Sequence, residues 1–111
     1  MAIKNNVKVE FKCTLTDILS ILGGKWSIPV IYNLCSGKKR FSELERIIPN
    51  INTRMLVKEL KNLEKTGIIN REAFATVPIT VEYSLTEKGK ALEPIIEDML
   101  EWGRKYQVNK L

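Results

Sequence analysis

Two short helical patterns joined by the tight turn PNIN, at residues 49–52, leave this chain few folds to adopt. The first pattern spans about residues 43–48 and ends before the proline of the turn, which cannot continue a helix. The second spans about residues 52–66, with Asn52 or Thr53 as its cap, and ends before Gly67. One side of this second helix is expected to face a core, because leucines recur at i, i+4 and i+7: Leu56, Leu60 and Leu63. This pattern predicts a helix-turn-helix.

Two further helices are predicted before the turn motif. The first follows a polar arm at residues 1–12, and either of two threonines can cap it, Thr14 or Thr16. It ends at the consecutive glycines 23–24, and a second helix of about residues 25–36 follows. The basic sequence that comes next leads into the helix-turn-helix.

The periodicity changes after Gly67. Residues 68–74 and 79–85 are rich in residues typical of strands, and apolar and polar residues alternate in the second segment. Four residues separate the two segments, so they are expected to form an antiparallel hairpin. A last helix is predicted from after Thr86 to about residue 104, and it is more apolar than a lone surface helix needs.

The order of helices, hairpin and helix predicts an α+β, mainly α, fold. We interpret it as a winged helix-turn-helix with extra N- and C-terminal dimerisation helices. With 111 residues, the chain has room for one domain. We expect that domain at residues 13–104, between an N-terminal arm at 1–12 and a C-terminal tail at 105–111.

Charge is distributed unevenly along the chain. Residues 1–65 hold 12 Lys or Arg against 6 Asp or Glu, whereas residues 66–111 hold 6 against 7. A basic half beside a nearly neutral one is expected when only one part of a protein faces a polyanion. A basic surface that is merely solvated is the alternative, which charge alone does not exclude.

Several function classes are disfavoured by what the sequence lacks. It contains no histidine, which removes the usual acid/base and nucleophile pairs of enzymes and most zinc sites. It has no GxGxxG, no P-loop motif and no CxxC, so we expect neither an enzyme nor a bound cofactor or metal. The longest apolar runs, such as residues 28–32, are too short for a membrane span. Two cysteines without a secretory signal favour reduced thiols in the cytoplasm.

The second helix of the predicted helix-turn-helix carries cations on the side opposite its leucines. Arg54, Lys58 and Lys61 recur at i, i+4 and i+7, together with Thr53 and Val57. A helix of this kind suits the major groove of double-stranded DNA, with its N-terminal residues at base edges and its later lysines at phosphates. The alternative is a solvated face stabilised by ion pairs with Glu59 and Glu64. The hairpin that follows, which would act as a wing, favours DNA.

Other polar residues around the motif are weaker candidates for phosphate contacts. A basic loop precedes the first helix of the motif: Lys38, Lys39 and Arg40. We expect Lys39 and Arg40 to clamp the DNA backbone. Ser42 can donate to a phosphate, although Glu45 three residues later predicts that the two form a capping box. Arg71, on the first hairpin strand, is a candidate phosphate contact near the wing.

Four segments together resemble the HxlR-type transcription regulators, which are relatives of the MarR winged-helix group. They are GGKW at 23–26, RFSELERIIPNINTRMLVKELKNLEKTGII at 40–69, VEYSLTEKG at 81–89 and EWG at 101–103. The resemblance covers residues 13 to about 102. It implies that the helix at 52–66 is the recognition helix and that the turn at 74–80 is the wing.

The resemblance also implies a homodimer that binds a pseudo-palindromic operator and acts, most commonly, as a repressor. The expected dimerisation residues lie on the N-terminal and last helices: Leu15, Ile18, Leu92, Ile95, Ile96, Met99 and Trp102. Some related regulators also bind a small-molecule effector between these helices and the DNA-binding lobe. One departure concerns the wing, where many members carry a second proline and then a cation. Here Ile79 and Thr80 follow Val77 and Pro78, so the tip is uncharged and Arg71 or Lys39 is expected to compensate.

Cys13 is a candidate redox sensor. It follows Lys12 and precedes a helix N-terminus, and both features favour the reactive thiolate. The resemblance supports this hypothesis, because a thiol-sensing subset of the family uses a cysteine at this position. The alternative is a small residue that packs against the partner subunit. Cys35 is expected in the core, and a Cys13–Cys35 bridge between subunits is a further hypothesis.

Two other functions are alternatives to DNA binding. A winged helix can dock another protein and seldom touch DNA, and salt dependence separates these cases because DNA binding weakens steeply with salt. A thiol enzyme that uses Cys13 would have no histidine to serve as its base. We therefore predict a sequence-specific DNA-binding transcription regulator.

Overall fold

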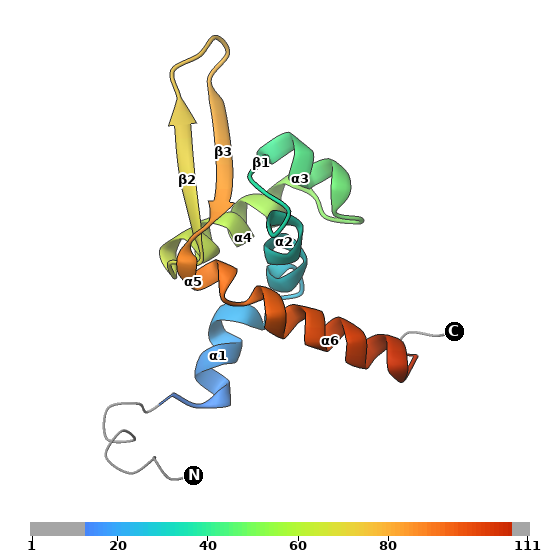
Figure 1. Cartoon of the computed structure of the whole chain (residues 1–111). Helices are drawn as coiled ribbons and strands as arrows, with labels where there is room; N and C mark the ends of the chain where they lie inside the picture. Colours follow the sequence, from blue (N-terminus) through green and yellow to red (C-terminus); the bar gives the residue numbers. More distant parts are fainter. Residues whose placement is uncertain (1–12, 108–111) are drawn as a thin grey trace.

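The computed structural model describes residues 13–107 (Figure 1). Its helices and strands follow one another in this order: α1 (Leu15–Leu22), α2 (Ser27–Leu34), β1 (Lys39–Arg40), α3 (Phe41–Ile47), α4 (Thr53–Lys65), β2 (Ile69–Phe74), β3 (Thr80–Leu85), α5 (Glu87–Lys90) and α6 (Glu93–Lys105). The predicted α+β, mainly helical, winged helix-turn-helix is confirmed. α3 and α4 are the two helices of the motif.

The strands form one antiparallel sheet in the order β1-β3-β2. β2 and β3 pair from Ile69 with Leu85 to Phe74 with Thr80, and this hairpin projects beyond the helices as the wing (Figure 1). The predicted hairpin is therefore present. No sequence pattern predicted β1, in which Lys39 pairs with Tyr83 and Arg40 pairs with Glu82.

The core lies where α2, α3 and α4 meet the base of the hairpin. The three leucines of α4 are almost completely buried, as their spacing predicted. They pack in one cluster with apolar residues from the other elements: Val30, Ile31, Leu34, Leu44, Ile48, Ile51, Ile68, Ile69, Tyr83, Leu85 and Ile96. Because this cluster holds one side of α4, the opposite side of that helix is directed outward.

Local caps fix the ends of α4. The side chain of Asn52 accepts a hydrogen bond from the backbone N–H of Met55 at 2.8 Å, so Asn52, and not Thr53, is the N-cap. At the other end, Gly67 has φ of +81°, a conformation that glycine adopts without steric cost. α4 therefore begins and ends where the sequence predicted.

The capping box predicted at Ser42 and Glu45 was wrong. α3 begins at Phe41, and the carboxylate of Glu43 accepts a hydrogen bond from the backbone N–H of Arg40 at 2.8 Å. The helix begins earlier than predicted because Lys39 and Arg40 pair with β3 and direct the chain straight into the first turn. Ser42 then lies inside that turn, and Glu45 contacts another element.

The single last helix predicted from Thr86 to about residue 104 is divided in two. α5 ends at Lys90, and α6 begins at Glu93 with Pro94 in its first turn. Proline has no backbone N–H and is tolerated only at a helix start, so a continuous helix through Pro94 would lose a hydrogen bond and clash with the preceding turn. α6 consequently extends away from the rest of the subunit in Figure 1.

Candidate nucleic-acid interface

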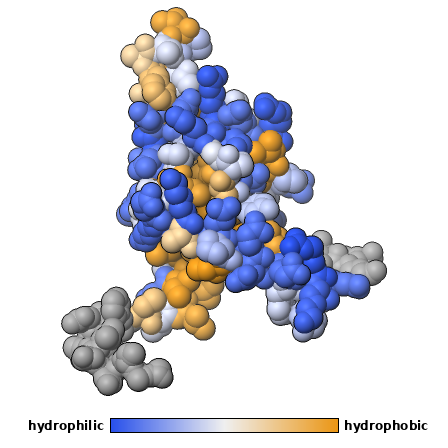
Figure 2. Space-filling model, viewed as in Figure 1, coloured by the Kyte–Doolittle hydropathy of each residue, from blue (hydrophilic) through white to orange (hydrophobic). Residues whose placement is uncertain are grey.

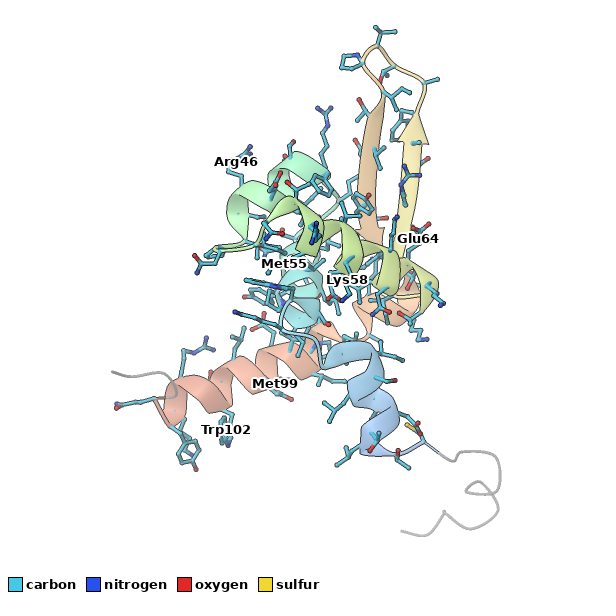
Figure 3. All side chains as sticks on the ribbon, turned by 180° about the vertical axis from the view of Figure 1, so that it is seen from behind. Arg46, Met55, Lys58, Glu64, Met99 and Trp102 are labelled. Carbon is cyan, nitrogen blue, oxygen red and sulfur yellow. The ribbon has the colours of Figure 1, made fainter. Side chains whose placement is uncertain are left out.

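The outward side of α4 carries a row of cations. Arg54, Lys58 and Lys61 are exposed, while the leucines of the same helix are buried beneath them. Lys65 continues the row at i+11 from Arg54 and is also exposed. Lys65 was not among the predicted residues, although the spacing that identified the other three cations also includes it. Figure 3 looks onto this side of α4, with Met55 and Lys58 labelled along it.

None of these cations is neutralised by a carboxylate within residues 13–107. The ion pairs found there involve other residues: Lys38 with Glu82, Lys90 with Glu87, and Arg104 with Glu101. The alternative of a face stabilised by Glu59 and Glu64 pairs therefore has no support. An exposed and unpaired row of cations keeps its full charge available to a polyanion.

The start of α4 is joined to α3 by a side-chain contact. The hydroxyl of Thr53 donates a hydrogen bond to the carboxylate of Glu45 on α3. Val57 is exposed one turn later, on the side of α4 that faces the hairpin. Thr53 and Val57 thus lie in the first two turns of α4, with Arg54 between them. Glu45 was assigned to a cap by sequence, and its contact with Thr53 was not predicted.

A groove between α4 and the wing brings together two predicted cations. Arg71 lies directly opposite Tyr83 in the hairpin, and both line this groove with Lys61 and Glu64 of α4. Arg71 is exposed, as is Lys61. The strand register therefore directs Arg71 toward α4, so the basic surface continues from the helix onto the hairpin.

The basic loop before α3 is less available than predicted. The ammonium of Lys39 donates to Ser36 Oγ at 2.9 Å and to the carbonyl of Gly37 at 3.4 Å. Lys38 forms its ion pair with Glu82 at 3.5 Å. Arg40 and Ser42 remain exposed and line a second groove, which is completed by wing residues: Pro78, Ile79, Thr80 and Val81. Arg40 therefore lies beside the wing and Lys39 is held by its own loop.

The wing tip is apolar and exposed. Val77 and Ile79 are both exposed, and no charged side chain stands between Phe74 and Thr80. Figure 2 shows this hydrophobic tip at the top of the molecule, separated from the hydrophobic surface at its foot. The uncharged wing expected from the sequence is thus present, and Arg40 lines the groove that includes Pro78 and Ile79 of this tip.

Comparison with known proteins assigns the family. A profile of HxlR-like helix-turn-helix proteins matches residues 21–110, which is most of the chain. This chain belongs to the HxlR-like helix-turn-helix family. Members are transcriptional regulators and not enzymes, and helix-turn-helix regulators bind DNA. The resemblance inferred from the sequence motifs is confirmed.

Individual relatives agree with this assignment. The uncharacterized HTH-type transcriptional regulator YdeP of Bacillus subtilis is 48% identical over 95 residues, which cover 86% of this chain and 74% of YdeP. The redox regulator HypR in its oxidized form superposes with a TM-score of 0.79 at 48% identity, covering 84% of this chain and 96% of that one. A regulator assigned to the MarR family, from Porphyromonas gingivalis, superposes with a TM-score of 0.80 at 32% identity, covering all of both chains.

The two cysteines of this HxlR-like chain have different surroundings. Cys13 is exposed immediately before α1. Cys35 is half-buried, and its thiol donates a hydrogen bond to the carbonyl of Ile31 at 3.4 Å. Burial, with the nearby carboxylates of Glu93 and Glu97, raises the pKa of the Cys35 thiol. The raised pKa leaves less of the Cys35 thiol as thiolate, the nucleophilic form, at neutral pH.

The terminal helices of this HxlR-like chain expose apolar side chains. α1 buries no residue, and Leu15 and Leu19 are 76% and 62% exposed. On α6 the predicted residues Ile95, Met99 and Trp102 are exposed as well, whereas Ile96 is buried in the subunit core and Leu92 packs against it. Figure 3 labels Met99 and Trp102 on α6, and Figure 2 shows hydrophobic surface gathered over α1.

Two negative findings concern the described part of the chain. Within residues 13–107, no three side chains of the metal-binding types cluster as a metal site would require. No helix in this range has the length and the apolar character needed to span a membrane.

Proposed function

We propose that this HxlR-like regulator is a homodimer that binds a pseudo-palindromic operator sequence-specifically and represses transcription. The observation that carries the proposal is the outward row of unpaired cations on α4, which is supported from behind by buried leucines. A helix of this kind, with a wing beside it, matches the shape and charge of a major groove and its flanking phosphates.

The residues of the interface divide into two roles. Arg54 is at the start of α4, where a side chain reaches base edges, and a guanidinium can bind guanine with two hydrogen bonds. Thr53 and Val57 lie near the same bases. Phosphate contacts set affinity and register, and we assign them to the other exposed cations and to one hydroxyl: Lys58, Lys61, Lys65, Arg40, Arg71 and Ser42. Lys39 would have to leave its own loop to join them.

Replacing Lys61 with alanine should weaken binding to every DNA sequence by a similar factor. Without this ammonium, binding releases fewer counterions from the DNA. The slope of log affinity against log salt should therefore become shallower by about one per subunit. Filter binding or fluorescence anisotropy over a salt series measures this slope. Lys105→Ala is the control, because Lys105 is an exposed cation at the far end of α6. Equal slopes for Lys61→Ala and the wild type would show that Lys61 does not contact DNA phosphates.

The dimer proposal rests on the terminal helices. α1 has eight residues and none of them is fully buried; Ile21 and Leu22, at its C-terminal end, are half-buried against the subunit core. So short a helix gains little stability from local interactions. Covering Leu15 and Leu19 with the apolar side of α6 from a second copy would supply the missing burial. Two recognition helices would then lie about 34 Å apart, or a multiple of that distance, in successive major grooves on one DNA face.

Met99→Lys should shift the protein from dimer to monomer. The substitution places an ammonium on the exposed apolar side of α6, where a partner subunit would have to desolvate it. Sedimentation velocity at one protein concentration measures the change. Glu97→Lys, which makes a larger change in charge two residues away on the same helix, should leave the dimer intact. If both variants remain dimers, this side of α6 is not the interface.

Oxidation should change the operator affinity through Cys13. The redox regulator HypR is a close structural neighbour, and Cys13 is exposed at the N-terminal end of α1. We expect diamide or a quinone to alter DNA affinity of the wild type and of Cys35→Ser, and to leave Cys13→Ser unaffected. If oxidation leaves the DNA affinity of the wild type unchanged, Cys13 is not a redox sensor and its role is to pack against the partner subunit.

A further inference from the structure

α2 begins without a cap of its own. The residue at its N-cap position is Trp26, whose side chain makes no capping hydrogen bond. The next residue, Ser27, is only 1% exposed, and its hydroxyl donates a hydrogen bond at 3.0 Å to Glu59 Oε2. Glu59 lies on α4, 32 residues later in the chain. A carboxylate from the recognition helix therefore lies at the N-terminal end of α2.

The backbone before α2 closes over this contact. A Cβ added to Gly24 would lie 2.9 Å from Ser27 Oγ, closer than real side chains pack, and 3.3 Å from Glu59 Oε1, which is a tight contact. The glycine thus lets the α1–α2 connection approach the carboxylate. Between Cys13 and Gln107 no cation forms an ion pair with Glu59, and the hydroxyl of Ser27 is the hydrogen-bond donor that its carboxylate contacts.

We propose that Glu59 is a positioning residue that sets the orientation of the recognition helix. It joins α4 to the start of α2, next to the connection that carries α1. On the proposed function, on which this inference rests, α1 lies at the subunit interface. The hydrogen bond between Ser27 and Glu59 then helps to fix the distance between the two recognition helices of the dimer, and hence the operator spacing that the dimer accepts.

If Glu59 does not position the helix, its removal should change DNA affinity in the opposite direction. A carboxylate on a DNA-facing helix that does nothing else repels phosphates, so removing it raises DNA affinity. If Glu59 positions the helix, Glu59→Ala lowers affinity by about tenfold, because the hydrogen bond it makes is charge-assisted. Glu64→Ala is the matched control, since it removes the same charge from an exposed position on α4 without touching Ser27.

The experiment measures affinity for the operator, once footprinting has located it. It also measures affinity for operators in which the spacer between the two half-sites has one base pair more or one fewer. The proteins are the wild type, Glu59→Ala, Glu59→Gln, Ser27→Ala, Glu64→Ala and the double variant of Ser27 and Glu59, each confirmed as folded by its thermal transition. Glu59→Gln should retain most of the affinity, because its amide oxygen still accepts from Ser27. The double variant should lose no more than either single alanine variant, and the alanine variants should discriminate less between spacers.

Four results would count against this account, and the last can be distinguished from the first three. Equal or higher affinity of Glu59→Ala, with normal binding by the wild type, would overturn the positioning role alone. Additive losses in the double variant, or unchanged discrimination between spacers, would do the same. Failure of the wild type and of Glu64→Ala to bind any DNA would overturn the proposed function and this inference together.

Discussion

Leu56→Ala should lower the free energy of unfolding by about 2–5 kcal/mol, which is a large part of the stability of a domain of this size. Leu56 is 0% exposed and lies in the cluster that holds α4 on the subunit. Truncation removes buried apolar surface and leaves a cavity that close-packed neighbours fill only in part. Urea denaturation followed by circular dichroism measures the loss. All variants must be compared at one protein concentration, because the stability of the proposed dimer would depend on it.

Val57→Ala is the control for this prediction. Val57 is the next residue on the same helix but is exposed, so its truncation should change stability by no more than about 0.5 kcal/mol. Similar losses at Leu56 and Val57 would contradict the burial on which the outward direction of the cations depends.

Arg54→Ala should reduce operator affinity by about 1–3 kcal/mol, or about 5- to 150-fold, and relax the preference at one base pair of each half-site. Arg54 is exposed in the first turn of α4, where side chains of a recognition helix meet base edges. Selection from a randomised half-site, before and after the substitution, measures the preference directly.

Arg54→Lys separates the two contributions of this side chain. Lysine keeps the positive charge but cannot form the paired hydrogen bonds of a guanidinium, so it should restore affinity more than it restores preference. An Arg54→Ala protein that keeps its full sequence preference would assign Arg54 to the phosphates.

Much of this candidate interface could be predicted from sequence because most of its cations lie on one helix. The leucine spacing defined the buried side of α4, and the same arithmetic placed Arg54, Lys58 and Lys61 on the other side. The hairpin was equally predictable from the sequence, because the alternation of apolar and polar residues and the turn are both local patterns. These patterns depend only on residues a few positions apart.

The features that the sequence did not reveal depend on contacts between segments. The capping box at Ser42 failed because pairing of Arg40 with Glu82, 42 positions along the chain, decides where α3 begins. The contacts of Glu45 with Thr53 and of Glu59 with Ser27 likewise join different helices. The break before α6 could have been predicted, since Pro94 lies inside the expected helix and proline is accepted only at a helix start.

The salt dependence of DNA binding tests the central claim most directly. Affinity for the DNA upstream of the protein's own gene should be measured between about 50 and 200 mM salt for the wild type and for a triple variant in which Lys58, Lys61 and Lys65 are glutamine. The account predicts a steep linear loss for the wild type and a slope smaller by about three per subunit for the variant. A wild type whose binding does not depend on salt, or a variant with the wild-type slope, would contradict the assignment of α4 as the DNA-binding surface.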